Sequence, residues 1–374
     1  MTKSKGNVLN FKGSNYFRQR LILSVLSSKP IYITEIRSKS DEPGLTEYEI
    51  NLLRLIDKIT NGTSLEVNET GTTLYFQPGM LTGGKFDHEC CKLRGIGYYF
   101  EAVLAFAPFC KKALEITLRG VTNNKIDPSV DSFKASALPL LRKFLIIDPG
   151  IELHIRKRGM EPEGGGEIHF ICPNLKLLRP IQIQDFGKIK RIRGIAFSLR
   201  TSPVLSNRVI EGAKSILLNF IPDVFITVDH LKGQNAGKSP GFGASLVAET
   251  TTETFYTADQ VCNIPPEPRS VPEDLGKELA FRLCEEIARG GCVDSSFQSL
   301  VCLFMALHQK DVSQCLFGPL SPYTIQFLRH LKTFFGVIFK LEPFIQEDED
   351  DYDLKQGSNK VVVTCVGTGF NKIA

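Results

Sequence analysis

The sequence predicts an α+β protein made of three repeated units and one smaller inserted domain. The first observation is that one order of elements recurs three times: a strand, a turn with Pro or Gly, an amphipathic helix and two more strands. The second is that this recurrence is interrupted between the second and third copies. The third is that the strands alternate or run apolar between Gly and Pro, which favours sheets with helices on one face.

The helix of the first copy carries the clearest periodicity. Its residues Ile50, Leu53, Ile56 and Ile59 recur every three positions, which places them on one face that packs into a core. The elements of this copy are a strand at 31–36, the turn Pro43-Gly44, a helix at 48–59 and strands at 64–68 and 72–77.

The other two copies repeat this order with different turn residues. The second has a strand at 114–121, Asp127-Pro128, a helix at 130–144 and strands at 151–156 and 167–172. The third has a strand at 315–317, Ser321-Pro322, a helix at 324–335 and strands at 337–341 and 361–366. A further helix opens each copy and is predicted at 17–26, 96–107 and 297–307.

The interruption predicts a separate small domain. The main domain is assigned to residues 1–179 and 273–374, and the inserted domain to residues 180–272. Within the insertion, strands are predicted at 195–199, 224–228 and 245–250, with a helix at 207–220. The acidic run Glu347–Asp351 is expected to be a solvated loop, because neighbouring like charges repel.

Composition excludes several classes of protein. The chain has 45 Lys and Arg against 41 Asp and Glu, and this net charge of +4 is too small for the whole surface to bind nucleic acid. RNA contact must therefore be local. No stretch reaches the roughly 18 apolar residues of a membrane span, and residues 1–10 lack the apolar run of a signal peptide. We expect a soluble intracellular protein whose ten cysteines are thiols, with no membrane partner.

Common cofactor motifs fail on their spacing. Gly233–Ser239 resembles a phosphate-binding loop, but it has three residues between its glycines instead of four, and Pro240 follows where a helix should begin. The six histidines are scattered and no Cys-x-x-Cys pair exists, so no zinc site is expected. His330 is read as a structural histidine. The sequence therefore predicts no metal and no other cofactor.

Two short basic segments are candidates for RNA contact. They are Arg156, Lys157 and Arg158, and then Lys188, Lys190, Arg191 and Arg193. Their cationic side chains could bind phosphates. Equally, lysines and arginines guard strand edges against aggregation, so a solvated edge explains the same residues. Both readings stay open.

Several motifs together resemble the RNA 3'-terminal phosphate cyclase-like proteins. They are Phe11–Arg20, Pro43–Leu45, Thr60–Gly62, Gly71–Thr73, Arg158-Gly159 with Glu163–Glu167, Lys238–Gly243 and Gly318–Pro322. The resemblance spans nearly the whole chain. It implies three units of the translation-initiation-factor-3 C-terminal kind, each a four-stranded sheet with helices, plus one small inserted domain, in agreement with the repeats.

The resemblance also identifies a substitution at the reactive position. True cyclases activate an RNA 3'-phosphate through an adenylyl-histidine, and here Tyr323 stands in the place of that histidine. A phenol with a pKa of about 10 stays protonated near neutral pH and needs a base to act as a nucleophile. Near the N-terminus, the bulky Phe11 and Lys12 replace a glycine-rich turn. No catalytic residue is therefore assigned.

The remaining pocket residues are polar. The resemblance places Arg18, Arg37, Thr122, Asn123 and Gln298 in the cyclase pocket. Arginines there could hold an RNA phosphate or an acidic side chain. The alternative is that they serve only as structural ion pairs.

The cyclase-like branch implies a function in ribosome assembly. By resemblance, the chain is expected to be a non-catalytic scaffold of the small-subunit processome in the nucleolus of the nucleus, where it binds a BMS-family GTPase and supports pre-rRNA cleavages that lead to 18S rRNA and the 40S subunit. One alternative is an endonuclease that itself cuts pre-rRNA, with Asp294, Asp311, Arg329 and His330 as candidate groups. Another is a residual RNA 3'-phosphate cyclase.

Overall fold

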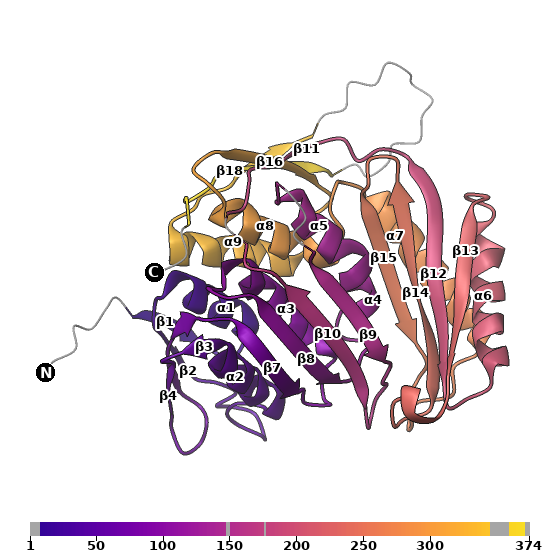
Figure 1. The fold of residues 1–374 in the computed structure, drawn as a ribbon, viewed down its shortest axis with the longest axis horizontal. Helices are drawn as coiled ribbons and strands as arrows, with labels where there is room; N and C mark the ends of the chain where they lie inside the picture. The colour runs from indigo at the N-terminus through magenta and orange to yellow at the C-terminus, as the bar shows by residue number, and fades with distance from the viewer. Residues whose placement is uncertain (1–7, 147–149, 176, 345–358, 371–374) are drawn as a thin grey trace, which may run out of the picture.

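Three four-stranded sheets share one topology. The computed structural model describes residues 8–146, 150–175, 177–344 and 359–370 (Figure 1). The first sheet has the order β1 (Leu9–Lys12), β2 (Ile31–Thr34), β5 (Leu74–Gln77), β4 (Ser64–Val67). Its first pair is parallel and the other two pairs are antiparallel. The predicted α+β class is confirmed.

The second and third sheets repeat this pattern of order and direction. The second is β7 (Gly84–Glu89), β8 (Leu114–Gly120), β10 (Gly166–Cys172), β9 (Glu152–Lys157). The third is β11 (Gln182–Ile183), β16 (Val312–Phe317), β18 (Val361–Val366), β17 (Lys340–Pro343). A short two-stranded sheet pairs β3 (Thr60–Asn61) with β6 (Met80–Leu81).

Each unit contains one strand more than the periodicity predicted. The leading strands β1, β7 and β11 lie parallel to the first predicted strand of their sheets. They escaped prediction because they carry little apolar signal: β7 reads Gly-Lys-Phe-Asp-His-Glu and β11 has two residues. The inserted domain therefore interrupts the third unit after its first strand. The predicted strand at 337–341 is also shifted, because β17 begins only at Lys340.

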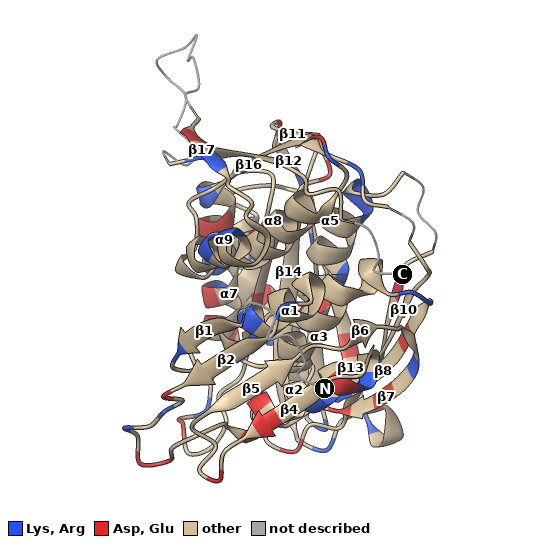
Figure 2. Cartoon of the chain, turned by 90° about the vertical axis from the view of Figure 1, so that its left-hand side faces the viewer, with Lys and Arg blue, Asp and Glu red and all other residues tan. Residues whose placement is uncertain are grey.

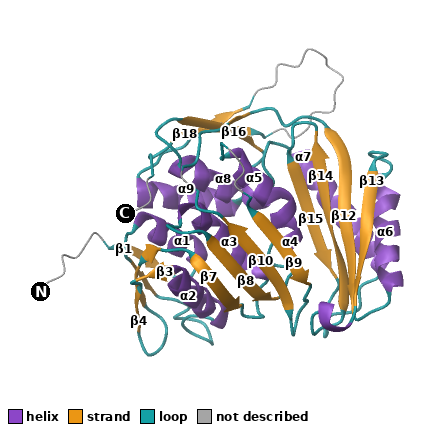
Figure 3. Cartoon of the chain, viewed as in Figure 1, coloured by secondary structure: helices purple, strands orange, loops and turns teal. Residues whose placement is uncertain are grey.

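The helices of the three units gather between the sheets, as Figures 1 and 3 show. They are α1 (Phe17–Ser27), α2 (Glu47–Ile59), α3 (Ile96–Phe106), α8 (Gln298–Leu307) and α9 (Pro322–Phe335). One hydrophobic cluster joins their buried faces to all three sheets. The helix predicted at 130–144 is not regular: α4 (Val130–Ser132) and α5 (Leu138–Lys143) flank a π-helical turn at 133–137.

The inserted sheet has its own core. Its order is β13 (Val224–Leu231), β12 (Ile189–Leu199), β14 (Gly241–Thr250), β15 (Phe255–Val261). Two helices, α6 (Pro203–Leu217) and α7 (Pro272–Arg289), complete a second hydrophobic cluster with it. Strand β15 was not predicted. The predicted boundary between the inserted domain and the main domain, at residues 272/273, stays a prediction. Helix α7 begins at this boundary and packs on the inserted sheet.

The acidic run Glu347–Asp351 lies outside the described residues. Within the described part, no helix combines the length and the hydrophobicity that a bilayer crossing requires. On the side of the molecule seen in Figure 2, basic and acidic residues are both present and alternate along the chain.

A candidate site where the three units meet

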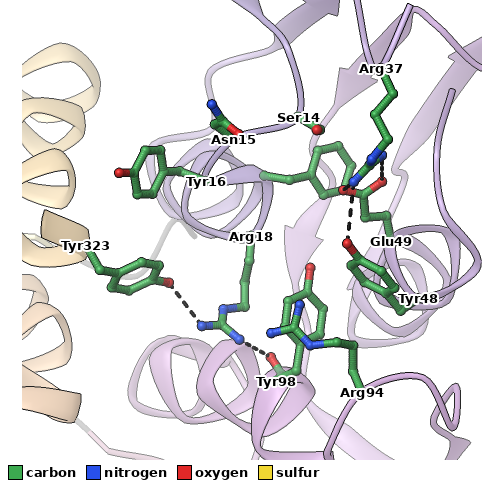
Figure 4. Close-up of a pocket in the computed structure, with 11 residues that line it drawn as sticks. Ser14, Asn15, Tyr16, Arg18, Arg37, Tyr48, Glu49, Arg94, Tyr98 and Tyr323 are labelled. Carbon is green, nitrogen blue, oxygen red and sulfur yellow. Dashed lines mark hydrogen bonds and ion pairs between the residues drawn. The ribbon is translucent and has the colours of Figure 1, made fainter. Parts of the chain in front are cut away.

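A polar pocket of about 300 Å³ lies where the helices of the three units converge (Figure 4). The first unit contributes most of its wall, the second contributes α3 and the residues before it, and the third contributes Tyr323 from α9. The lining residues are Ser14, Asn15, Tyr16, Phe17, Arg18, Arg37, Tyr48, Glu49, Arg94, Tyr98 and Tyr323. Three arginines and four tyrosines therefore surround one cavity.

Arg18 joins all three units through its guanidinium group. It forms an ion pair with Glu101 of α3, and donates hydrogen bonds to the Tyr98 carbonyl at 3.0 Å and to the Tyr323 hydroxyl at 3.1 Å. Burial alone would lower the pKa of Arg18, but the Glu101 carboxylate, together with Tyr323, Tyr98 and Asp127, outweighs burial, and the pKa is raised. Arg18 is therefore a buried, fixed cation, although its Nε atom has no hydrogen-bond partner among the described residues.

Tyr323 is held as a hydrogen-bonding bridge. Its hydroxyl donates to Glu101 Oε1 at 2.9 Å while it accepts from Arg18. Burial raises the pKa of this phenol above its ordinary value, and the opposing charge of Arg18 does not reverse the shift. Phenolate formation at neutral pH is therefore even less favourable than in water. A nucleophile in this state lacks the lowered pKa or the free general base that activation requires.

The other two arginines of the pocket are also paired with carboxylates. Arg37 makes a bidentate contact with Glu49 at 2.7 and 2.8 Å, and Glu49 closes a capping box at the start of α2 with Thr46. Arg94 makes a bidentate ion pair with Asp127. Both Arg18 and Arg94 lie against the ring of Tyr98: the guanidinium carbon of Arg18 is 4.5 Å from the ring centroid and that of Arg94 is 4.3 Å from it. The pocket is thus rich in donors but close to charge balance.

Two residues of the pocket adopt unusual backbone conformations. Tyr16 has φ of +58° and Arg37 has φ of +45°, a region that side chains with a Cβ atom rarely occupy. Such strain persists only where the surrounding structure fixes it, and it is concentrated at functional sites. Ser28, Glu35, Arg200 and Glu253 share this conformation without lining the cavity, so backbone strain by itself does not distinguish the pocket.

The structure separates the five residues that the resemblance placed in the pocket. Arg18 and Arg37 line it. Thr122 and Asn123 are buried elsewhere, where they bond to Gly159 and Asp131. Gln298 accepts hydrogen bonds from Ser321 and Thr324 at the start of α9 and does not line the cavity. The sequence argument missed Arg94, Glu101 and Tyr98, because no local pattern indicates that they meet Arg18.

Thr122, Asn123 and Arg158 belong to a second polar cluster, at the junction of the second unit and the insertion. Arg158 is buried and binds Asp131 at 2.6 and 2.8 Å and Asp229 of β13 at 2.7 Å. Its side chain is therefore engaged in structural ion pairs and is not exposed for contact with RNA. The guanidinium carbon also lies 5.0 Å from the Phe197 ring centroid.

Glycines allow the backbones to approach at this junction. A Cβ atom on Gly159 would lie 2.2 Å from the Gly166 nitrogen. The amides of Gly237 and Lys238, within the stretch that resembles a phosphate loop, donate to carbonyls of Arg158 and Gly164. Strand β14 follows instead of a helix. These two amides are thus already hydrogen-bonded within the protein and are not free to bind a phosphate. Geometry therefore argues against a nucleotide-binding loop here, as the spacing does.

The other basic residues lie nearer the surface. Arg156 is half exposed beside Glu167, while Arg191 and Arg193 form ion pairs with Glu249 and Asp223 at 2.7 Å. Lys188 and Lys190 are exposed, and Lys157 is half-buried. These six residues stay candidates for RNA contact.

The residues suggested for cleavage are held in separate networks. Asp294 is buried and accepts from Thr257 of the insertion and from the Ser296 amide. His330 is buried against Gln19, and burial lowers its pKa to about 4, so it stays neutral. Asp311 is exposed and accepts from the Val312 amide. The described residues contain no group of three or more His, Cys, Asp or Glu that could hold a metal ion.

Comparisons with known proteins agree with the fold and the motifs. The family model described as RNA 3'-terminal phosphate cyclase matches residues 9–341. The RNA 3'-terminal phosphate cyclase-like protein of Homo sapiens is 55% identical over 372 residues, covering 99% of this chain and 98% of the human protein. The rRNA processing protein rcl1 of Schizosaccharomyces pombe is 39% identical over 370 residues, covering 98% of each chain. This chain therefore belongs to the RNA 3'-terminal phosphate cyclase family.

Proposed function

We propose that this chain is a non-catalytic scaffold in nuclear pre-rRNA processing. The observation that carries the proposal is the state of Tyr323, whose hydroxyl is bound on one side by Arg18 and on the other by Glu101. The residue at the position of the covalent histidine thus ties three units together, and its raised pKa opposes nucleophilic attack. The name of the fission yeast relative supports rRNA processing as the context.

The finer parts of the proposal rest on family resemblance. The chain is proposed to act in the small-subunit processome in the nucleolus, where it binds a BMS-family GTPase and supports the cleavages that lead to 18S rRNA and the 40S subunit. In this role the repeated sheets serve as docking surfaces. Exposed basic residues such as Arg156, Lys188 and Lys190 are the proposed contacts to pre-rRNA.

The pocket is proposed to retain a weak anion site. Arg37 and Arg94 are both partly exposed, and their ion pairs with Glu49 and Asp127 leave further N–H donors facing the cavity. An acidic side chain or an RNA phosphate can accept these donors. Because each arginine already has a carboxylate partner, binding is expected to depend on hydrogen-bond geometry more than on net charge.

The test separates scaffold from enzyme. Cells depleted of the endogenous protein are supplied with the wild type or with Tyr323→Phe, and 18S rRNA and its precursors are measured. We expect full processing with Tyr323→Phe, because the scaffold needs no hydroxyl nucleophile. Failure of a folded Tyr323→Phe protein to support processing would contradict the proposal, as would covalent labelling of the purified wild type by radioactive ATP.

Binding is tested separately for each partner. Purified chain is titrated with the GTPase and with a pre-rRNA fragment, and Lys190→Ala and Arg94→Gln are compared with wild type. We expect Lys190→Ala to weaken RNA binding alone, with a smaller salt dependence. The scaffold proposal fails if the wild type binds neither partner.

A further inference from the structure

Strand β13 forms an open edge of the inserted sheet. In Figures 1 and 3 it lies at the right-hand margin beside α6, with no strand beyond it. Among the described strands it pairs only with β12, in parallel and in unbroken register from Ile192 opposite Val224 to Leu199 opposite Leu231. It is eight residues long, twice the length of the edge strands β4 and β17.

The hydrogen bonds at its two ends show which backbone groups face outward. Ile192 donates to the Asp223 carbonyl, and Arg200 donates to the Leu231 carbonyl. In a parallel ladder this register directs the backbone groups of the odd-numbered residues of β13 toward β12. The N–H and C=O groups of Ile226 and Val228 therefore point away from the sheet, and no other described residue bonds to them.

This edge lacks the usual protection against pairing. The segment Val224–Val228 reads Val-Phe-Ile-Thr-Val, with no proline, no charge and no bulge against β12. Natural proteins guard exposed edges with such features. The edge strand β9 shows them, since it carries charged residues and a register shift, and β17 contains Pro343. Five consecutive unguarded residues at an open edge suggest that another strand covers them.

Exposed apolar side chains accompany the open backbone. On β13, Phe225 is 59% exposed and Val228 is 43% exposed. Leu218 and Phe220, in the segment that leads from α6 into β13, are about half exposed. Phe225 and Val228 lie on opposite faces of the sheet, so an added strand would pack beside one of them on each face as it satisfies the outward backbone groups.

Charge at the two ends of the strand defines the chemistry of the occupant. Asp223 and Asp229 are neutralised by Arg193 and Arg158. By contrast, Lys190, on β12 just before the start of the pairing, and Lys232, just after β13, are exposed and have no carboxylate partner among the described residues. An uncharged strand centre is thus bracketed by two unpaired cations.

We propose that β13 accepts an extended segment of a partner protein as an added strand. The segment would have about five alternating β-branched or aromatic residues, to match Val224–Val228, and an acidic residue at each end to meet Lys190 and Lys232. This inference goes beyond the proposed role in rRNA processing and does not depend on it, because a peptide alone tests it.

The probe is a fluorescein-labelled peptide, acetyl-Glu-Val-Thr-Val-Thr-Val-Glu-amide, titrated with the full chain and followed by anisotropy. Val228→Pro removes one outward N–H without touching the β12 ladder and should weaken binding about tenfold. Phe225→Ala should weaken it about threefold by removing a cross-strand contact. Phe281→Ala is the matched control, because Phe281 is 58% exposed but lies on α7, which packs on β14 and β15, and it should bind like wild type.

Three results would overturn the proposal. The first is equal binding of a peptide that is N-methylated at its five central amides, because such a peptide cannot extend a sheet. The second is peptide binding that does not distinguish the folded variants from the wild type. This means either that Val228→Pro and Phe225→Ala both bind with wild-type affinity or that the wild type does not bind at all. The third is a concentration-dependent dimer of the chain that Phe225→Ala disrupts, which would assign the edge to a second copy of this protein.

Discussion

Replacement of Arg158 decides whether this residue supports the fold or binds RNA. Its guanidinium group makes three hydrogen bonds of 2.6 to 2.8 Å to Asp131 and Asp229, and its side chain is only 4% exposed. Arg158→Met preserves most of the volume but leaves Asp131 buried without its cation. Breaking a buried pair in this way costs about 3–5 kcal/mol. Urea unfolding at pH 7 should show this loss.

The pH dependence gives an independent signature. Burial alone would raise the pKa of Asp131, but the charge and hydrogen bonds of Arg158, together with Asn123 and Lys134, outweigh burial, and the pKa lies below its ordinary value. In the wild type this carboxylate therefore adds stability above the unfolded pKa of about 4, which is lost as pH falls through the lower folded pKa. In Arg158→Met burial dominates and the folded pKa rises. The deficit of the variant should then shrink as pH falls from 7 toward 5.

Arg156→Met is the matched control. Arg156 is half exposed and lies 3.4 Å from Glu167, so its loss should change the free energy of unfolding by at most about 0.5 kcal/mol. A direct RNA contact predicts the opposite pattern, in which Arg158→Met weakens RNA binding and leaves stability unchanged. A deficit below about 1 kcal/mol, or one that does not vary with pH, would refute the structural reading.

Three further predictions concern the pocket, a buried histidine and the inserted domain. Glu101→Gln should destabilise the chain by about 2–4 kcal/mol, because it leaves Arg18 buried beside a neutral group. Its cost and that of Arg18→Met should not add in a double-mutant cycle; additive costs would show that the two residues are uncoupled. His330→Gln should flatten the dependence of stability on pH between about 6.5 and 4. Burial holds the pKa of His330 at about 4, so the stability it contributes is present above the unfolded pKa and is lost as pH falls through 4. A slope unchanged from the wild type in these urea titrations would be contrary to this view. Gly276→Ala should cost about 1–3 kcal/mol in thermal unfolding, since its new carbon would lie 2.1 Å from a carbonyl of α6; an unchanged midpoint would argue against this close crossing.

Local periodicity predicted the elements that bury an apolar face. The helix at 48–59 is α2, and it begins where Thr46 and Glu49 form a capping box. The leading strands were missed because β1 has only four residues, β7 carries a single large apolar residue, Phe86, and β11 has two residues. Periodicity reports burial, so a strand at the edge of a sheet with little buried surface gives little signal.

The sites depended on contacts that no sequence pattern encodes. Arg156 and Arg158 are two residues apart, yet one is half exposed and the other binds Asp229, 71 positions later. Likewise Arg18 meets Tyr323 across 305 positions. Motif resemblance named residues of both clusters, but Thr122 and Asn123 lie beside Arg158 and do not line the pocket, because a motif identifies residues without the partners that they meet in space.

The link from Arg18 through Tyr323 to Glu101 explains how a polar pocket can be held together by its own contacts. These three side chains come from α1, α9 and α3, one from each repeated unit. Removing Arg18 or Glu101 leaves a buried charge without its partner, and removing the Tyr323 hydroxyl takes one hydrogen bond from each of them, at a cost in folding free energy. Stability alone therefore retains this ion pair and its bridge. Likewise, the strained backbone at Arg37 is held by the contacts of its side chain with Glu49 and with the Gly44 carbonyl.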